Sequence, residues 1–274
     1  MDLSTRAERT GRRADDSTAM DTAVRVGLVS YGLVHLIIAW LAVRLVLGDS
    51  SGSASSQGAL QQLASTPVGR VSLYVVAGGF LALVLWQGLE AVWGHRDEDG
   101  GKRTLKRVVS AAKVVLYASL AYSAVRTATG SSSGSGGTDG LTARLMQLPG
   151  GPLIVGAVGA GVLAVAGFLA YRGLAEKFRS KLEVDGQTGK DGRAYVLCGK
   201  IGYVGKAVAL AIVGGLFLYA AVTEDPQKSG GLDVALHKLL GEPFGGPMLL
   251  LVALGFACYG VFCFAWARHL DREG

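Results

Sequence analysis

The fold of this chain follows from one stretch of its sequence, residues 24–48, which reads VRVGLVSYGLVHLIIAWLAVRLVLG. A transmembrane helix needs about 20 consecutive, mainly apolar residues, and this stretch is long enough. Inside a bilayer its backbone polar groups would find no water, so the segment must satisfy them itself as a helix. The stretch therefore predicts a membrane-spanning helix close to the N-terminus.

The same stretch is the first of three copies. When the sequence is shifted by 82 positions, Arg44 falls on Arg126. When it is shifted by 175 positions, Gly27 falls on Gly202. The chain is therefore built from three sequence repeats of one membrane-spanning unit.

The apolar residues of the whole chain are gathered in runs. Half of the residues are hydrophobic and 18% are charged, which alone would also suit a soluble protein. Six runs of about 20 apolar residues predict six membrane helices, and no alternating segments typical of a β-barrel occur. The predicted spans are Val24–Leu47, Val71–Trp93, Val108–Ala128, Pro152–Tyr171, Gly199–Val222 and Pro247–Ala267.

The positive charges lie in the connections between the runs. The net charge of +6 could indicate nucleic-acid binding, but this distribution is that of membrane topology. Nineteen Lys and Arg residues fall on the side of the two termini and six on the other side. Both termini are therefore predicted to be cytoplasmic, and residues 1–23 are interpreted as a disordered cytoplasmic tail rather than a signal peptide.

The connections on the other side of the membrane also repeat. Two contain Ser/Gly-rich stretches, SSGSASSQG at 50–58 and SSSGSGG at 131–137, and a short amphipathic segment then leads to a proline. Pro67, Pro149 and Pro243 are each followed two positions later by glycine. The unit is thus predicted as a span, a loop, a short surface helix, a Pro-x-Gly turn and a returning span.

The predicted fold class is an all-α polytopic membrane protein with six transmembrane helices, arranged as three tandem two-helix repeats in a pseudo-threefold bundle. Each repeat has an even number of spans, so all three insert in the same direction. The predicted organisation is a tail at 1–23 and repeats at 24–97, 104–182 and 198–271.

The repeats carry a family resemblance. Each opens with a span of the type G-x-x-x-[RK]-x-x-x-Y and continues through P-x-G into a glycine-rich returning span, over residues 24 to 271. This pattern resembles the family called domain of unknown function 1206, which implies an actinobacterial multi-pass membrane protein without an established activity. The basic position of the family falls on Lys113 and Lys206, with Tyr31 in the first copy. The aromatic position falls on His35, Tyr117 and Leu210.

Polar residues inside the spans are the candidates for a functional site. A charge at the centre of a span costs roughly 2.5–3.5 kcal/mol on insertion scales, so Lys113 and Lys206 need an explanation. One interpretation is an inward-facing ion or proton site, with Glu90 as counter-charge and His35 as a proton relay. The other is that both lysines extend their charges toward the lipid headgroups. The candidate intramembrane polar site comprises Lys113, Lys206, His35, Glu90 and Tyr117.

Glycines are dense in the returning spans. Small residues let helix backbones approach closely in membranes. We therefore expect the second, fourth and sixth spans to pack around the pseudo-threefold axis through small residues. The residues expected at these contacts are Gly78, Gly79, Ala157, Gly161 and Gly255.

No motif in the sequence indicates catalysis. There is no nucleophile–base set, no HExxH or Walker motif, and the three cysteines lack metal-site spacing, so no enzyme, cofactor or metal is expected. The main hypothesis is a structural or scaffolding role in the plasma membrane. The alternative is a small channel or transporter with a cytoplasm-facing polar site. The expected partners are the lipid bilayer and other membrane proteins or further copies of the chain, with no nucleic acid.

Overall fold

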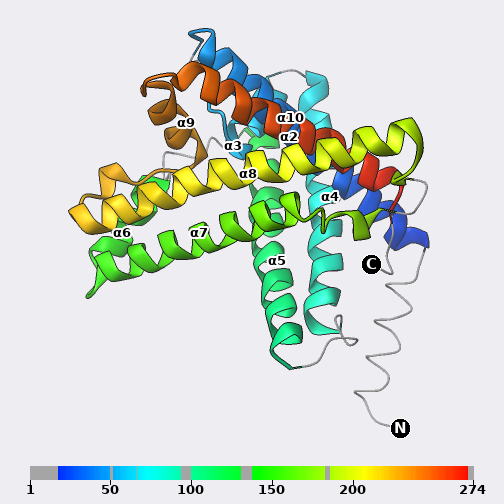
Figure 1. Ribbon diagram of the computed structural model, residues 1–274, viewed down its shortest axis with the longest axis horizontal. Helices are drawn as coiled ribbons and strands as arrows, with labels where there is room; N and C mark the ends of the chain where they lie inside the picture. The colour runs from blue at the N-terminus through cyan, green and yellow to red at the C-terminus, as the bar shows by residue number, and fades with distance from the viewer. Residues whose placement is uncertain are drawn as a thin grey trace. The chain divides into compact units, whose positions relative to one another are not determined.

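The computed structural model describes residues 18–49, 52–65, 67–93, 100–130, 138–182 and 186–270. Within these ranges the regular structure is helical, apart from one isolated bridge between Leu182 and Leu270 (Figure 1). The long helices are α2 (Thr18–Val46), α4 (Pro67–Val92), α5 (Gly100–Ala128), α7 (Gly151–Leu174), α8 (Gly189–Thr223) and α10 (Gly245–Arg268). The short ones are α3 (Ser56–Ala64), α6 (Thr138–Met146), α9 (Leu232–Leu240) and the 3-10 turns η1 (Arg179–Lys181) and η3 (Pro226–Lys228). The predicted all-α fold is confirmed.

The six long helices correspond to the six predicted spans. Each is long and apolar enough to cross a membrane. Helices α5 and α8 begin well before the apolar runs that predicted them, because polar residues can continue a helix beyond the bilayer. Helix α8 has 35 residues, roughly 52 Å of helix, whereas the hydrocarbon core is about 30 Å thick. One end of α8 must therefore project from the membrane.

The N-terminal boundary of the first span differs from the prediction. The sequence pattern predicts a disordered tail up to residue 23, but helix α2 already begins at Thr18. The apolar run marks only the part of the helix that suits hydrocarbon, and its polar first turn carries no hydropathy signal. The rest of the predicted tail, residues 1–17, lies outside the described residues.

Short helices and tight turns lead into the returning spans, as predicted. Helices α6 and α9 precede α7 and α10. The backbone N–H of Gly151 donates to the carbonyl of Leu148 over 2.8 Å, and the N–H of Gly245 donates to the carbonyl of Glu242 over the same distance. The second and third repeats thus enter their returning helices through the same hydrogen-bonded turn.

The glycine of this turn is required by its surroundings. A Cβ atom on Gly245 would collide with the carbonyl oxygens of Leu239 and Leu240 at the end of α9. Backbone atoms cannot rotate away, so a side chain there must push α9 and α10 apart. The Pro-x-Gly motif therefore reflects the close approach of the short helix to the start of the returning helix.

Gly245→Ala is expected to lower the free energy of unfolding by about 1–3 kcal/mol, as other overpacking substitutions do. Thermal unfolding of the purified protein in detergent measures the effect. Gly246→Ala is the matched control, because its Cβ would meet only Val46, at 3.9 Å. Equal melting temperatures for the two variants would contradict the close approach of α9 to the start of α10 at Gly245.

The contacts divide the chain into two compact units. Unit 1 comprises residues 1–31 and 63–131, and unit 2 comprises residues 32–62 and 132–274. Unit 1 thus contains the beginning of α2 with α4 and α5. Unit 2 contains the remainder of α2, α3 up to Gln62, and α6 to α10.

Unit 1 is built on a helix crossing and a helix hairpin. Helices α2 and α4 cross where a Cβ on Gly27 would lie 2.6 Å from the carbonyl oxygen of Gly79. Helices α4 and α5 form the hairpin, and the guanidinium of Arg107 donates to the carbonyl of Val92 over 2.8 Å. Fully buried side chains of this unit include Leu28, Leu73, Phe80 and Leu83.

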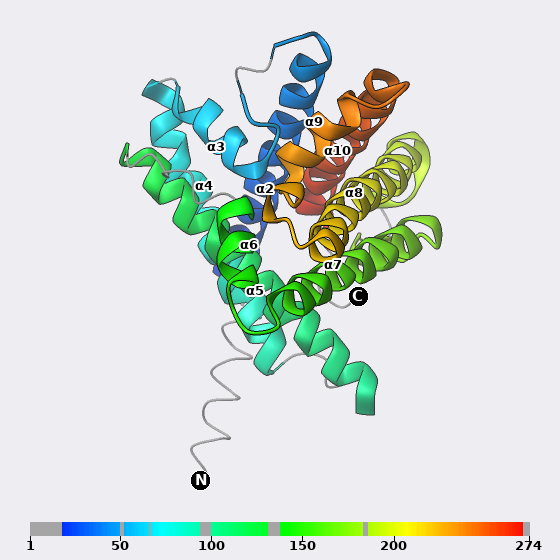
Figure 2. The same ribbon diagram turned by 90° about the vertical axis from the view of Figure 1, so that its left-hand side faces the viewer.

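Unit 2 contains a second long hairpin. Helices α7 and α8 run side by side in both views (Figures 1 and 2) and meet where a Cβ on Gly159 would lie 3.0 Å from the carbonyl oxygen of Gly214. Helix α10 also packs against α8. A buried cluster shared by α7, α8 and α9 consists of Val155, Val213, Phe217 and Ala235.

The remainder of α2 packs on α10 within unit 2. A Cβ on Gly32 would lie 2.9 Å from the carbonyl oxygen of Gly260. The backbone N–H of Ala54 also donates to the Asp233 carboxylate of α9 over 2.7 Å, which joins the connection between α2 and α3 to the third repeat. The pseudo-threefold arrangement of the repeats stays a prediction.

Candidate functional site

Two of the candidate polar residues contact one tyrosine inside unit 2. The imidazole of His35 on α2 lies 4.8 Å from the ring of Tyr259 on α10, measured between ring centroids. The ammonium nitrogen of Lys206 on α8 lies 4.0 Å from the centroid of the same ring. His35 and Tyr259 are buried, with 4% and 6% of their surfaces exposed, and Lys206 is half-buried.

Glycines bring the three helices close enough for these contacts. A Cβ on Gly202 would lie 2.6 Å from the Cα of Tyr259, and a Cβ on Gly205 would lie 2.5 Å from the Cα of Gly255. Together with the contact of Gly32 on Gly260, these positions hold α2 and α8 directly against α10. The ring of Tyr259 thus lies between side chains of two opening helices.

Two further side chains extend this contact, and we call the set His35, Lys206, Tyr259, Tyr203 and Cys263 the Tyr259 cluster. Side-chain hydrogen bonds join Tyr259 to Tyr203 and to Cys263. The cluster therefore places an imidazole, an ammonium group, two phenols and a thiol next to one another inside the helix bundle of unit 2.

Aromatic and basic groups continue from the cluster along α8. The ring of Tyr203 is stacked on Phe178 with a centroid distance of 5.3 Å, and the guanidinium carbon of Arg172 lies 5.5 Å from the centroid of Tyr203. Phe178 also meets Phe262 edge-on at 5.2 Å. These contacts connect the cluster to the end of the hairpin between α7 and α8.

The aromatic surroundings explain how a lysine is accommodated within a span. An ammonium group over an aromatic face gains about 0.5–2 kcal/mol, with the larger value in desolvated sites. That gain offsets much of the insertion cost of roughly 2.5–3.5 kcal/mol for a charge at the centre of a helix. In this structure the charge of Lys206 is held against α10 by Tyr259.

The other candidates lie in unit 1. Tyr117 on α5 is buried, meets Tyr31 edge-on at 5.5 Å and is stacked with Phe80 at 6.4 Å. Lys113 and Glu90 are half-buried on the paired helices α5 and α4. The structure therefore brings His35 and Lys206 together in unit 2 and places Tyr117, Lys113 and Glu90 in unit 1. A single site that contains all five residues stays a prediction.

His35 and Tyr117 occupy equivalent positions in the repeats and contact equivalent phenylalanines. These residues are 82 positions apart and occupy the same column of the opening span. Their partners Phe256 and Phe80 are likewise equivalent when Pro243 is aligned with Pro67. His35 lies 5.9 Å from Phe256, and Tyr117 lies 6.4 Å from Phe80. In both cases a ring on an opening helix packs on a phenylalanine of a returning helix.

The expected packing glycines divide into two groups. Gly79 and Gly255 lie at close contacts, but these contacts are with the opening helices α2 and α8, whereas contacts between returning helices had been expected. A Cβ on Gly78 or Gly161 would meet no atom within 4 Å, and Ala157 is exposed. Helix α7 approaches α8 through Gly159 instead, because 157 and 161 fall on a different side of the helix.

Tyr259 was not singled out from the sequence, although a signal was present. Tyrosines of membrane proteins concentrate at the membrane interfaces, and Tyr259 lies in the middle of the run FACYGVFCF. A tyrosine at that depth needs a polar partner for its hydroxyl group. The neighbouring Cys198 and Cys258, on α8 and α10, also have their thiols within hydrogen-bonding contact.

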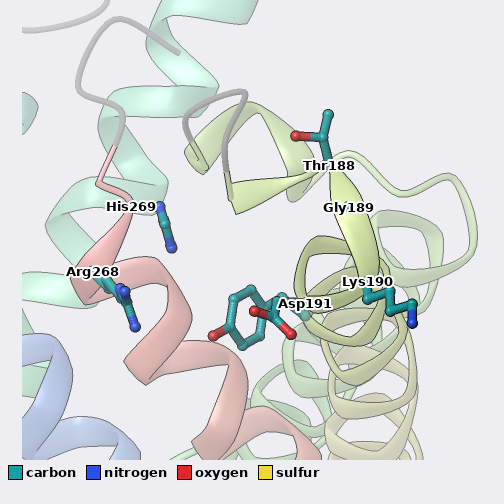
Figure 3. Close-up of a pocket in the computed structure, with 7 residues that line it drawn as sticks. Thr188, Gly189, Lys190, Asp191, Arg268 and His269 are labelled. Atoms are coloured by element: carbon teal, nitrogen blue, oxygen red, sulfur yellow. The ribbon is translucent and has the colours of Figure 1, made fainter.

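A polar hollow of about 190 Å³ lies where α8 begins and α10 ends (Figure 3). The ring of Tyr195 lies 6.1 Å from that of His269 across this region. Charged residues that line the hollow are Lys190, Asp191 and Arg268. Among the residues that the structure describes, no three His, Cys, Asp or Glu side chains gather as they would around a metal ion.

Comparisons with known proteins agree with the threefold organisation. The profile of a family described as Domain of Unknown Function (DUF1206) matches three segments, residues 26–94, 108–176 and 201–269. The chain is also 28% identical to the uncharacterized protein YxxB of Bacillus subtilis (strain 168), over 87% of this chain and 86% of that protein. No solved structure matches the chain. The actinobacterial origin implied by the sequence pattern stays a prediction.

Proposed function

The chain belongs to the DUF1206 family, and from that premise we propose that it is a structural protein of the plasma membrane. In this proposal its six helices form a rigid, non-enzymatic scaffold in the bilayer, to which other membrane proteins or further copies of the chain attach. Both termini are cytoplasmic, as the excess of Lys and Arg in the connections on that side favours.

The observation that carries this proposal is the direct backbone contact between helices at glycines. Helix pairs α2–α4, α2–α10 and α8–α10 each meet where a single Cβ atom would lie within 3 Å of a neighbouring backbone atom. In a membrane, where lipid tails are as apolar as leucine, such close contacts supply much of the association energy. Helix pairs without room for one methyl group favour fixed packing within each unit over helices that rock against each other.

The contacts of the polar candidates support the same role. His35 occupies the repeat position of Tyr117 and packs on the equivalent phenylalanine. Lys206 places its charge over the ring of Tyr259. Each of these side chains thus links an opening helix to a returning helix, which is sufficient reason for its presence within a span.

A flux measurement tests the proposal. The purified protein is reconstituted in vesicles that contain a pH-sensitive dye, and proton and potassium gradients are imposed. We expect the same flux from wild type, from Lys113→Met/Lys206→Met and from protein-free vesicles. Lys177→Met, an exposed residue outside the spans, is the matched control for the loss of positive charge. A wild-type flux that only the double variant abolishes would contradict the structural role.

That contrary result would favour a second function, a small channel or transporter for protons or cations. The observation behind it is the Tyr259 cluster, in which an imidazole, phenols and an ammonium group meet inside unit 2. Neighbouring titratable groups of this kind can pass a proton along a helix bundle. In this alternative Lys206→Met and His35→Phe would each lower the flux.

A further inference from the structure

Two of the three cysteines face each other across the contact between α8 and α10. The thiols of Cys198 on α8 and Cys258 on α10 lie within hydrogen-bonding contact and are not bonded covalently. Both side chains are half-buried. Cys263 is fully buried, and its thiol contacts the side chain of Tyr259 instead. The pair therefore differs from the third cysteine both in its partner and in its access to small reagents.

Glycine packing holds the backbones that carry these two thiols close together. Gly202 lies four positions after Cys198 and hence on the same side of α8. A Cβ atom on Gly202 would lie 2.6 Å from the Cα of Tyr259, the residue that follows Cys258. A disulfide needs Cα atoms about 4.4–6.8 Å apart, a separation that two helices reach where small residues let their backbones meet. The contact at Gly202 thus supplies the close approach that a bond between the two sulfur atoms requires.

A metal ion explains the pair less well than sulfur chemistry does. A structural zinc site uses four ligands, commonly cysteine and histidine. Among the residues that the structure describes, no third His, Cys, Asp or Glu side chain joins these two thiols. Two facing thiols without a further ligand can still react with each other, by oxidation to a disulfide.

We propose that Cys198 and Cys258 are a reversible redox pair, which hydrogen peroxide oxidises to a disulfide that bonds α8 covalently to α10. Hydrogen peroxide is small and uncharged, so it reaches half-buried thiols within a bilayer. The pair is in the reduced form in this structure. A cellular thiol such as glutathione returns it to that form by exchange with the disulfide.

The oxidation proceeds in two steps. The thiolate of one cysteine attacks a peroxide oxygen and the O–O bond breaks, which gives a sulfenic acid and a hydroxide ion that takes up the thiol proton to become water. The sulfur of the other cysteine then attacks the sulfenic acid. The S–S bond forms, the S–O bond breaks, and the oxygen leaves as a second water with the proton of the second thiol. The two sulfur atoms together lose two electrons, and one molecule of peroxide accepts them.

The disulfide fixes the packing of α8 on α10 beside the Tyr259 cluster, because Cys258 directly precedes Tyr259. A covalent link between distant positions of a chain stabilises the folded state. The inference requires the contact between these two helices and does not depend on the proposed structural role.

Thiol counting on the detergent-purified full chain tests the proposal. The reduced protein is treated with an equimolar amount of hydrogen peroxide, unfolded and alkylated with a maleimide, and the intact mass gives the number of free thiols. We expect wild type to fall from three free thiols to one, and dithiothreitol to restore all three. Peptide mapping of the oxidised wild type, which needs no variant, should identify Cys198 linked to Cys258. The oxidised form should melt at least about 5 °C higher than the reduced form.

Cys263→Ala is the matched control, because it removes a cysteine of the same helix and leaves the pair intact. It should fall from two free thiols to none, whereas Cys198→Ser and Cys258→Ser should each keep both of theirs. Melting temperatures of the reduced variants show that each is folded. Three free thiols in peroxide-treated wild type, loss of two thiols in Cys258→Ser, or separate oxidation of the pair to sulfinic acids would overturn the proposal. Disulfide-linked dimers in place of the internal bond, or an oxidised form that melts no higher than the reduced form, would also overturn it.

Discussion

Gly205→Val is expected to separate α8 from α10 and to unfold the protein at temperatures that leave wild type intact. A Cβ at this position would lie 2.5 Å from the Cα of Gly255, and a Cβ at Gly255 would lie 2.6 Å from the Cα of Gly205. Both neighbours are backbone atoms, so no rotamer change relieves the collision. We expect a loss of at least about 3 kcal/mol, the upper end of the usual range for overpacking.

The matched control for this substitution lies on the same helix. Gly215→Val adds the same isopropyl group to α8, but its Cβ would meet nothing within 4 Å. Both substitutions carry the same helix propensity, so the difference between their melting temperatures isolates the contact with α10. If Gly205→Val melted at the temperature of Gly215→Val, the close packing of α8 on α10 would be refuted.

Tyr259→Leu is expected to lower the free energy of unfolding by about 3 kcal/mol, from the lost packing of a large buried ring together with the lost contact with the ammonium group. Lys206 then retains its charge within the span without the aromatic face beneath it. We therefore expect Lys206→Met to destabilise wild type but to stabilise the Tyr259→Leu variant. The coupling energy of this double-mutant cycle should approach about 2 kcal/mol, the value for a desolvated cation–aromatic pair.

Tyr259→Phe distinguishes the contribution of the aromatic ring to stability from that of the hydroxyl group. It retains the aromatic face under Lys206 and removes the hydrogen bonds to Tyr203 and Cys263. The coupling between position 259 and Lys206 should survive in this variant. A coupling energy near zero in the cycle with Tyr259→Leu would show that the ring does not stabilise the charge of Lys206.

Most of the fold could be predicted because the membrane imposes few solutions. Runs of about 20 apolar residues must be helices, and their recurrence establishes the repeat. The ends of the helices could not be predicted in the same way. Gly100 to Arg107 is polar, and hydropathy does not distinguish a helix that continues into water from a loop, yet α5 begins at Gly100.

Less of the candidate site could be predicted, because it depends on which faces of the helices meet. The glycines of the returning spans were recognised, but their partners Gly27 and Gly205 on the opening helices were not. The depth of Tyr259 in its span signals a need for a polar partner, but its neighbours can be named only when the contacts of α2 and α8 with α10 are known. Single-sequence periodicity shows that a helix has a small-residue face and does not show which helix covers it.

The central claim is that one two-helix membrane unit is inserted three times in the same direction, and its most direct test is cysteine labelling in intact cells. Single cysteines are placed at Gln57, Gln147 and Gln227 in the three outer connections and at Lys190, in a chain whose native cysteines are replaced. We predict that a membrane-impermeant maleimide labels the first three positions from outside and labels position 190 only after permeabilisation. Labelling of position 190 from outside, or protection of any one of the other three, would contradict the threefold parallel insertion.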